Sequence, residues 1–293
     1  MNTRKIAGRL FSVLLLSLFS VATADAQDAP KKKVKHGSFY LSWGYNTEWY
    51  TRSNLHIRQK GMGNDYKLMK VIARDHRGWD KDLLHQDFTI PQYNYRLGYY
   101  FNEKQDLAFE INFDHTKYII QDNQWVRMKG TRNNAPVDEE VFLSQANGFY
   151  YFLNNGANFL LFNIVKRVGL YTTPDRKFYV DLTGKAGIGP VIPHVENNIF
   201  GMKNDKGFQI GGWNTGLETA LRVTVMRYGY LEFAQKVDYA RYSNLKVYNG
   251  RARQNFGTYE LILSVGAMIP YSKNNPLFGR ALQPDSTAIA PAQ

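Results

Sequence analysis

The chain has 293 residues, no cysteine, and 37 Lys and Arg against 25 Asp and Glu, which gives a formal net charge of +12. The absence of cysteine excludes a disulfide-stabilised scaffold, and the positive charge favours anionic partners. Aromatic residues make up 15% of the chain and include 20 tyrosines, but no apolar run after residue 26 is long enough for a membrane-spanning helix.

Residues 1–26 have the features of a secretory signal peptide. Arg4, Lys5 and Arg9 precede the short apolar run "LFSVLLLSLFSVA", and the small residues "ADA" follow it. A single-pass membrane anchor is the alternative, but the run is short and is followed directly by a cleavage site. Because this segment holds three basic residues and one acidic residue, its removal leaves a formal charge of +10.

An exported basic chain in a Gram-negative envelope meets the phosphates of lipopolysaccharide first, so lipid A and lipopolysaccharide are the expected partners. Nucleic acid is not expected in that compartment. Residues 27–37 are predicted to be a short periplasmic segment before the folded domain.

Eight segments alternate between apolar and polar side chains with the period of two that is typical of β-strands. In the first of them, Phe39, Leu41 and Trp43 alternate with Tyr40, Ser42 and Gly44. The eight predicted strands are residues 39–49, 91–101, 107–118, 158–171, 178–192, 213–225, 231–239 and 258–269.

The fourth segment, 158–171, alternates less well than the others. Lys166 falls among its apolar positions, and Phe159 and Leu161 fall among its polar ones. A β-bulge, or a lysine whose stem lies along the apolar surface, would reconcile this segment with a strand.

The connections between these strands alternate between short and long. Residues 102–105, 172–177 and 227–229 are short, whereas the connections after the first, third, fifth and seventh strands are long. This is the pattern of an eight-stranded antiparallel transmembrane β-barrel with short periplasmic turns and longer extracellular loops. The segment "DYKLMKVIARD" at 65–75 would make the strand count odd, so we interpret it as a hairpin above the membrane.

The sequence therefore predicts an all-β barrel over residues 38–271 in the outer membrane of a Gram-negative bacterium. Residues 272–293 are predicted to be a flexible periplasmic tail. We expect a monomer.

A soluble β-sandwich is the alternative interpretation of the alternation. A sandwich would expose the charged side of each strand, whereas a barrel encloses that side. The polar positions hold acidic and basic residues together, and eight strands form a lumen just wide enough for such side chains to fill. We therefore predict a barrel whose inward charges form a structural plug.

Two histidines lie where outward-running strands end. His115 ends the third strand and His194 follows the fifth, so both are predicted at the level of the outer-leaflet headgroups, on strands roughly 10 Å apart. Pro190 and Pro193 predict a bend that could re-aim His194. Together with Glu196, the two histidines could act as a base or as a set of metal ligands. The alternative is an ordinary pair of histidines at the membrane interface.

Basic side chains in the long connections could contact lipid phosphates, or they could simply be solvated. They include Arg52, Arg58, Lys60, Lys67, Lys70, Arg251 and Arg253.

Five stretches, in this order and spacing, resemble the lipid A oxidase-like outer-membrane β-barrels. They are "PQYNYRLGYYF", "FDHTKY", "NGANFLLFNIVKR", "GPVIPHVEN" and "GFQIGG", and the resemblance runs from about residue 89 to residue 270. It implies oxidation of the proximal glucosamine of lipid A to an aminogluconate, with molecular oxygen as co-substrate. A divalent metal is the candidate cofactor that it implies.

The resemblance also assigns candidate roles to single residues. His115, His194 and Glu196 are the candidate catalytic residues and the tentative metal ligands, while Lys117, Asn158 and Gln209 are the candidate substrate-binding residues. Gly156, Asn163 and Pro193 also match the family pattern. The competing hypothesis is a non-enzymatic outer-membrane barrel that serves envelope integrity or loop-mediated binding.

Overall fold

The computed structural model describes residues 37–76, 92–102, 105–153, 155–175 and 177–270. The predicted signal peptide, most of the segment before residue 37 and the predicted C-terminal tail lie outside the described residues. In the described part of the chain, no helix is long and apolar enough to cross a membrane.

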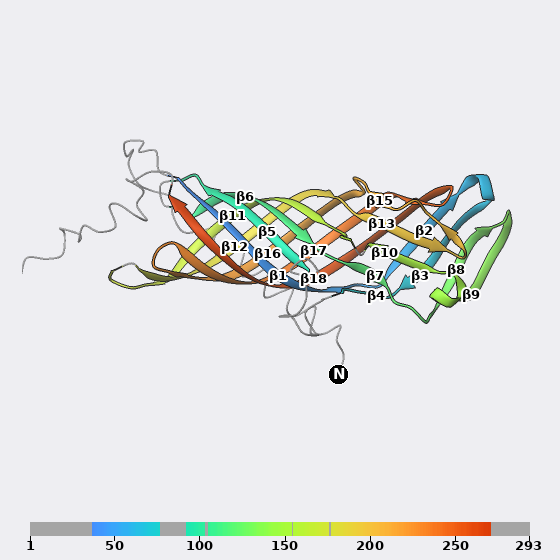
Figure 1. The fold of residues 1–293 in the computed structure, drawn as a ribbon, viewed down its shortest axis with the longest axis horizontal. Coiled ribbons are helices and arrows are strands. Elements are labelled where there is room, and N and C mark those ends of the chain that lie inside the picture. Colours follow the sequence, from blue (N-terminus) through green and yellow to red (C-terminus); the bar gives the residue numbers. More distant parts are fainter. Residues whose placement is uncertain (1–36, 77–91, 103–104, 154, 176, 271–293) are drawn as a thin grey trace, which may run out of the picture.

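Eight antiparallel strands form a closed ring (Figure 1). Their order is β1-β5-β6-β11-β12-β16-β17-β18, and β1 pairs with β18 to close the ring. The bounds are β1 Ser38–Tyr50, β5 Tyr93–Tyr100, β6 Leu107–His115, β11 Phe159–Thr172, β12 Phe178–Val191, β16 Gly212–Val225, β17 Gly229–Val247 and β18 Gly250–Pro270. All eight predicted strands and their antiparallel order are confirmed.

The outer surface of the ring is apolar. Two aromatic pairs mark its extracellular end, Trp49 with Tyr259 at 5.8 Å between ring centroids and Trp213 with Tyr239 at 5.7 Å. Exposed apolar side chains cover the strands below these pairs, among them Leu41, Leu97, Ile111, Ile164, Ile188, Leu221, Leu231, Phe233, Leu263 and Val265. A closed antiparallel ring with an apolar exterior is the form in which β-structure spans a bilayer, so the chain is an outer-membrane β-barrel.

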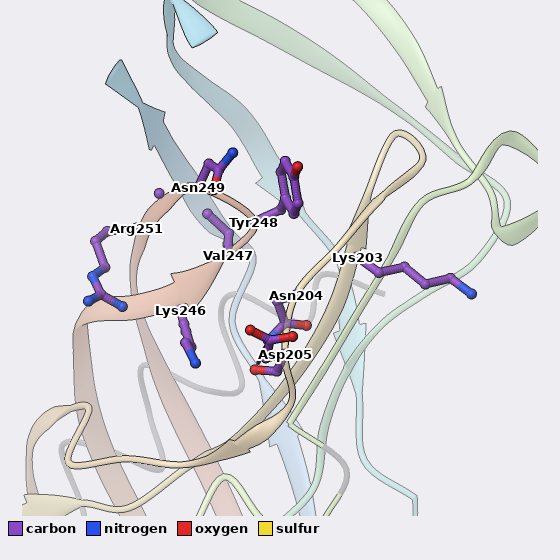
Figure 2. A pocket seen from close by; sticks show the side chains of 9 residues that line it. Lys203, Asn204, Asp205, Lys246, Val247, Tyr248, Asn249 and Arg251 are labelled. Carbon is purple, nitrogen blue, oxygen red and sulfur yellow. Dashed lines mark hydrogen bonds between the residues drawn. The ribbon is translucent and has the colours of Figure 1, made fainter. Parts of the chain in front are cut away.

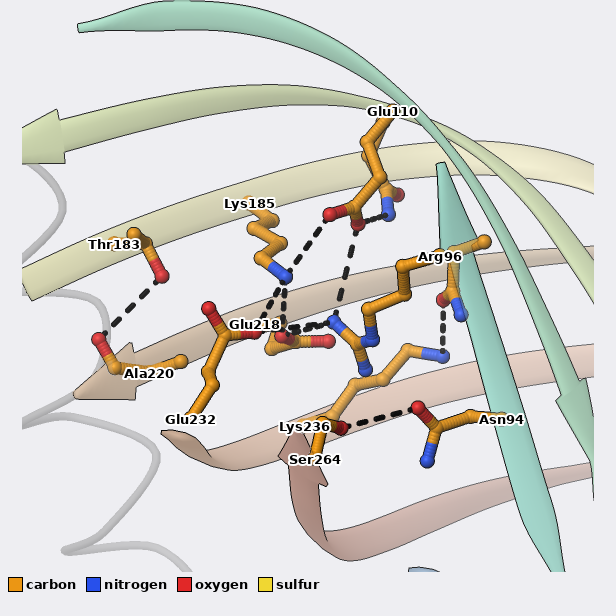
Figure 3. A network of polar contacts seen from close by, with 12 residues as sticks. Asn94, Arg96, Glu110, Thr183, Lys185, Glu218, Ala220, Glu232, Lys236 and Ser264 are labelled. Atoms are coloured by element: carbon orange, nitrogen blue, oxygen red, sulfur yellow. Dashed lines mark hydrogen bonds and ion pairs between the residues drawn. The ribbon is translucent and has the colours of Figure 1, made fainter. Parts of the chain in front are cut away.

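Charged side chains fill the interior of the membrane-spanning part (Figure 3). Arg96 Nη1 lies 2.5 Å from Glu218 Oε1, and Lys185 Nζ lies 3.1 Å from Glu110 Oε2 and 3.0 Å from Glu232 Oε1. Arg222 is 2.6 Å from the second oxygen of Glu232. Since these buried cations and carboxylates are matched in number, the network fills the lumen as the alternation predicts.

A second interior group surrounds Lys236 and is richer in acids. The Lys236 ammonium pairs with Asp114 and lies 3.3 Å from Asp238 and 3.7 Å from Glu260. All four side chains are buried. A single ammonium therefore faces three carboxylates in this part of the interior.

The fourth predicted strand is β11, and its irregularity has two parts. Lys166 does face outward, near the periplasmic end, where its ammonium lies 2.5 Å from Asp106. The register shift is further along, between Gly169 and Tyr171. Phe159 and Leu161 are buried and face inward, and Phe159 belongs to the apolar core that begins at this height.

The barrel continues above the membrane as an extracellular extension. Strand β2 (Ser53–Gln59) follows β1 along the same partner, β18, and pairs with β3 (Asn64–Val71). This β2–β3 pair confirms the hairpin predicted around residues 65–75. The remaining strands are β4 Ala73–Arg74, β7 Tyr118–Ile120, β8 Gln124–Arg132, β9 Ala135–Leu143, β10 Tyr150–Leu153, β13 His194–Ile199, β14 Met202–Lys203 and β15 Gly207–Phe208.

The extension encloses an apolar core, in contrast to the charged lumen below it. Its buried members come from nearly every strand of the extension: Leu55, Ile57, Tyr66, Leu68, Val126, Met128, Tyr151, Leu153, Phe159, Val191, Val195, Ile199, Tyr242 and Phe256. The sheet that carries β2 and β3 ends at the hairpin β8–β9, where β9 has β8 as its one neighbour among the described strands.

Candidate functional site

The candidate site lies on the outward face of the rim, where β6, β11 and β12 leave the membrane. Asn158 directly precedes β11 and links the other two strands. Its Oδ1 lies 2.9 Å from Nδ1 of His115, and its Nδ2 donates to the carbonyl of Ile192 at 2.9 Å. The structure therefore brings together His115, predicted as catalytic, and Asn158, predicted as substrate-binding.

The imidazole of His115 is held on its other side by Tyr93. The two rings stack with centroids 4.5 Å apart and an interplanar angle of 13°. Stacking and the bond to Asn158 together fix the plane of the imidazole. Tyr93 pairs with His115 across β5 and β6, a contact that the register determines and that we did not predict from the sequence.

His194 begins β13, one strand further round the rim. Its backbone N–H donates to the carbonyl of Gly156 at 2.8 Å, which continues the ladder after the break at Ile192 and Pro193. Its ring packs against Phe208 with centroids 4.9 Å apart. The side chain is 9% exposed, and its buried Nδ1 has no hydrogen-bond partner among the described residues.

Gly156 lies between the two histidines and has to be a glycine. Its φ is +117°, and a Cβ at this position would lie 2.1 Å from Oδ1 of Asn158. Any side chain here would displace the amide that holds His115. The local structure thus explains why the position that matches the family pattern is a glycine: its backbone adopts a conformation that other residues rarely adopt.

Lys117 lies just above His115, between β6 and β7. Its backbone N–H donates to Oε1 of Gln92 at 2.6 Å, and its carbonyl accepts from the hydroxyl of Tyr50 at 2.9 Å. The side chain is largely buried, and this burial lowers the pKa of its ammonium.

Glu196 lies on β13, on the same face as His194 but about 7 Å further along the strand. It pairs with Phe152 of β10, next to Tyr150. Burial raises the pKa of the Tyr150 hydroxyl, and the charge of Glu196 raises it further. Glu196 therefore faces an aromatic surface above the two histidines.

Two further residues that match the family pattern, Gln209 and Asn163, hydrogen-bond to other parts of the protein. Gln209 donates to the carbonyl of Asn244 at 3.0 Å and accepts from the backbone N–H of Lys246 at 3.0 Å, so its side chain ties the loop after β13 to β17. Asn163 points into the lumen, where its amide donates to Glu110 at 3.0 Å.

The residues do not assemble the metal centre that the resemblance allows. In the described part of the chain, no three side chains of His, Cys, Asp or Glu are placed to hold a metal ion. His115, His194 and Glu196 are all described, and they do not converge in this way.

No protein-family model matches this chain, and no curated protein sequence matches it. Among solved structures it is similar to the outer membrane protein OprG from Pseudomonas aeruginosa, at 11% identity over 80% of this chain and 97% of that one, with a TM-score of 0.38. It is also similar to the outer membrane protease OmpT from Escherichia coli, at 9% identity over 84% and 100%, TM-score 0.37. It is similar as well to Ail of Yersinia pestis, at 15% identity over 80% of this chain and 100% of that one, with a TM-score of 0.33. All three are outer-membrane proteins, and the barrel assignment itself rests on the closed ring and apolar exterior of this chain.

Proposed function

We propose that this barrel chemically modifies lipid A in the outer leaflet, at the outward face of the rim around His115 and His194. The observation that supports the proposal is the buried Nδ1 of His194, which has no protein partner among the described residues although the ring is fixed against Phe208. Buried polar atoms normally have hydrogen-bond partners, so an orphaned one beside a lipid-facing surface favours a ligand there.

Further features suit a phosphorylated glycolipid. His115 lies beside the aromatic residue Tyr93 at the extracellular end of the ring, which is the height of lipid headgroups. The ammonium of Lys117 is nearby in the chain and could offset a phosphate charge. In this arrangement one imidazole takes a proton from the sugar and the other donates a hydrogen bond to it.

The finer form of the proposal is oxidation of the proximal glucosamine to an aminogluconate, as the family resemblance implies. The sugar carries a free hydroxyl at C1, molecular oxygen takes up two electrons and two protons and leaves as hydrogen peroxide, and water opens the resulting lactone, so that lipid A gains one oxygen atom. We include no metal in this step, because the described residues do not form a metal centre.

Mass spectrometry of lipid A tests the proposal. A strain lacking the gene is complemented with the wild-type chain or with His115→Ala, His194→Ala or His56→Ala and grown with aeration. We expect lipid A that is heavier by one oxygen atom with the wild type and with His56→Ala, and no shift with the two rim variants. His56 is the matched control, because it is bonded to Asp65 in the extension and not at the rim.

Only variants that still form the barrel are compared for the mass shift. Folding of the barrel is judged by heat-modifiable mobility in gels. An unchanged lipid A spectrum with and without the wild-type gene would defeat the proposal and leave a non-enzymatic barrel. Loss of the shift without oxygen would support the oxidative form specifically.

A further inference from the structure

The outer surface of the extension carries a group of exposed cations, which we call the cationic face. It consists of Lys246 on β17, Arg251 and Arg253 on β18, Arg58 on β2 and Lys67 on β3, all exposed. The strand register places them in adjacent rows: Lys246 is opposite Arg251, Arg251 is opposite Arg58, and Arg253 and Lys67 are each opposite His56.

Like charges directly opposite each other across strands destabilise a sheet. Lys246, Arg251 and Arg58 form an unbroken row of three across β17, β18 and β2. Alternation alone does not require three cations here, since any polar side chains would suit an exposed surface. A row of this kind is stable when an anion lies across it.

Asp65 is a carboxylate beside these cations, and it is already engaged. Asp65 lies 2.6 Å from Nε2 of His56 and 3.2 Å from Nε of Arg58. Lys246 and Arg251 have no ion pair with any residue that the structure describes. By contrast, in the neighbouring hairpin β8–β9 the cations have a carboxylate partner, because Asp138 pairs with both Arg127 and Lys129.

A pocket of about 420 Å³ opens beside the row (Figure 2). Lys246 and Arg251 line it from the β17–β18 hairpin, and Asn204 and Asp205 line it from the loop after β14. The pocket is large enough for one sugar ring. Asn204 and Asp205 can bind its hydroxyl groups, while Lys246 and Arg251 bind an acidic substituent.

The height of the cationic face selects among anionic partners. Arg253 is six residues above Tyr259 on β18, which for a strand tilted by about 40° is roughly 15 Å above the outer aromatic pairs. This is beyond the lipid A headgroup and level with the first core sugars of lipopolysaccharide, which carry phosphates and carboxylates. The side chains point sideways from the barrel, toward neighbouring lipid molecules, and not upward.

We infer that the cationic face is a binding site for the anionic core sugars of an adjacent lipopolysaccharide molecule. The row of Lys246, Arg251 and Arg58 binds the acidic groups, and the pocket receives a sugar ring. This site is separate from the rim around His115 and His194, and it does not depend on any modification of lipid A.

The test uses the mature full-length chain in phosphatidylcholine nanodiscs, titrated with two probes: lipopolysaccharide with a phosphorylated core, and lipid A without core sugars. We expect the wild type to bind the first more tightly than the second. The triple variant Arg58→Gln, Lys246→Gln, Arg251→Gln should bind the core-bearing probe about tenfold more weakly, since three charge contacts are lost. High salt should reduce the wild-type preference.

The matched control removes the same charge at the periplasmic end of the barrel, with Lys166→Gln, Lys177→Gln and Arg227→Gln, and should bind like the wild type. Equal binding of the core-bearing probe by the wild type and the triple variant would overturn the inference. So would equal binding of the two probes by the wild type. A second measurement checks the repulsion itself: without any probe and at low salt, the triple variant should resist urea at least as well as the wild type.

Discussion

Lys236 is the cation at the centre of the acid-rich part of the interior. Its ammonium lies among the carboxylates of Asp114, Asp238 and Glu260, all of them buried. Removing one partner of a buried ion cluster leaves charge without compensation, so Lys236→Gln should lower the free energy of unfolding by about 3–5 kcal/mol. Urea unfolding of the barrel in lipid vesicles measures the effect.

Lys166→Gln is the matched control for that experiment. Lys166 also pairs with a carboxylate, Asp106, but both side chains are partly exposed at the periplasmic end, and surface pairs contribute roughly 0–1 kcal/mol. Equal losses in the two variants would contradict the interpretation of the Lys236 cluster.

Asp65 makes the stability of the extension depend weakly on pH. Its hydrogen bond to His56 holds the pKa of the Asp65 carboxyl below its ordinary value, and the charge of His56 lowers it further. A carboxyl whose pKa is depressed by folding contributes stability above its unfolded pKa, about 4, and loses it as the pH falls through the folded value.

Asp65→Asn should therefore cost under about 1 kcal/mol at neutral pH, because the pair is half exposed. The difference between the variant and the wild type should disappear as the pH is lowered below 3. Urea unfolding at a series of pH values measures it, and a difference that persisted in acid would show that the carboxylate charge is not the cause.

Several site residues could be placed from the sequence because strand parity fixes which way a side chain points. His115 and Asn158 meet at the rim for that reason. Phe208 and the aromatic neighbours of Glu196 could not be placed, because their positions depend on how the chain turns after Pro193 and pairs β13 with β10 and β15.

At the scale of elements, the strands β17 and β18 extend well beyond their predicted ends. The alternation predicts each strand only as far as its last outward apolar residue, which in β18 is Tyr259. Above it the outward positions are Arg253 and Arg251, whereas the inward ones, Ala252 and Phe256, become apolar. The strand continues above the membrane, but there its outward side chains are polar and its inward ones are apolar. Outward apolar residues therefore mark the strand only up to the membrane surface.

The extension should be destabilised separately from the membrane ring. Leu55→Ala removes a fully buried side chain from the apolar core, which typically costs about 2–5 kcal/mol. Hydrogen exchange should show lost protection in β2, β3 and β10, while β5 and β6 in the membrane keep theirs. Leu263→Ala, at an exposed lipid-facing position, is the control and should change neither region. Uniform loss over all strands would contradict a separable extension.

The whole molecule is one cylinder with two kinds of interior, a charged one in the membrane part and an apolar one in the extension. The membrane part encloses ion pairs behind an apolar exterior, and the extension encloses an apolar core behind a charged exterior. The alternation predicts the barrel because the membrane part supplies most of the alternating segments. The extension follows the rule of soluble proteins, which explains why a soluble sandwich fits the same sequence in part.

The filled interior predicts that the barrel does not conduct ions. Arg96, Lys185 and Arg222 are fully or almost fully buried with their carboxylates, and the apolar core lies directly above them. Planar bilayer recordings with the purified chain should show no channel openings. Steady openings of porin size would contradict the packing, and the variant Lys236→Gln tests whether loosening the plug creates them.

The hairpin β8–β9 ends one sheet of the extension, and the strand at that end carries Asp138, Glu139 and Glu140 in succession. A bare strand edge invites another chain to add to it, and charge along the edge discourages this. The charged side chains along this edge therefore disfavour strand addition between neighbouring barrels on a crowded cell surface, and with it their assembly edge to edge into a fibre.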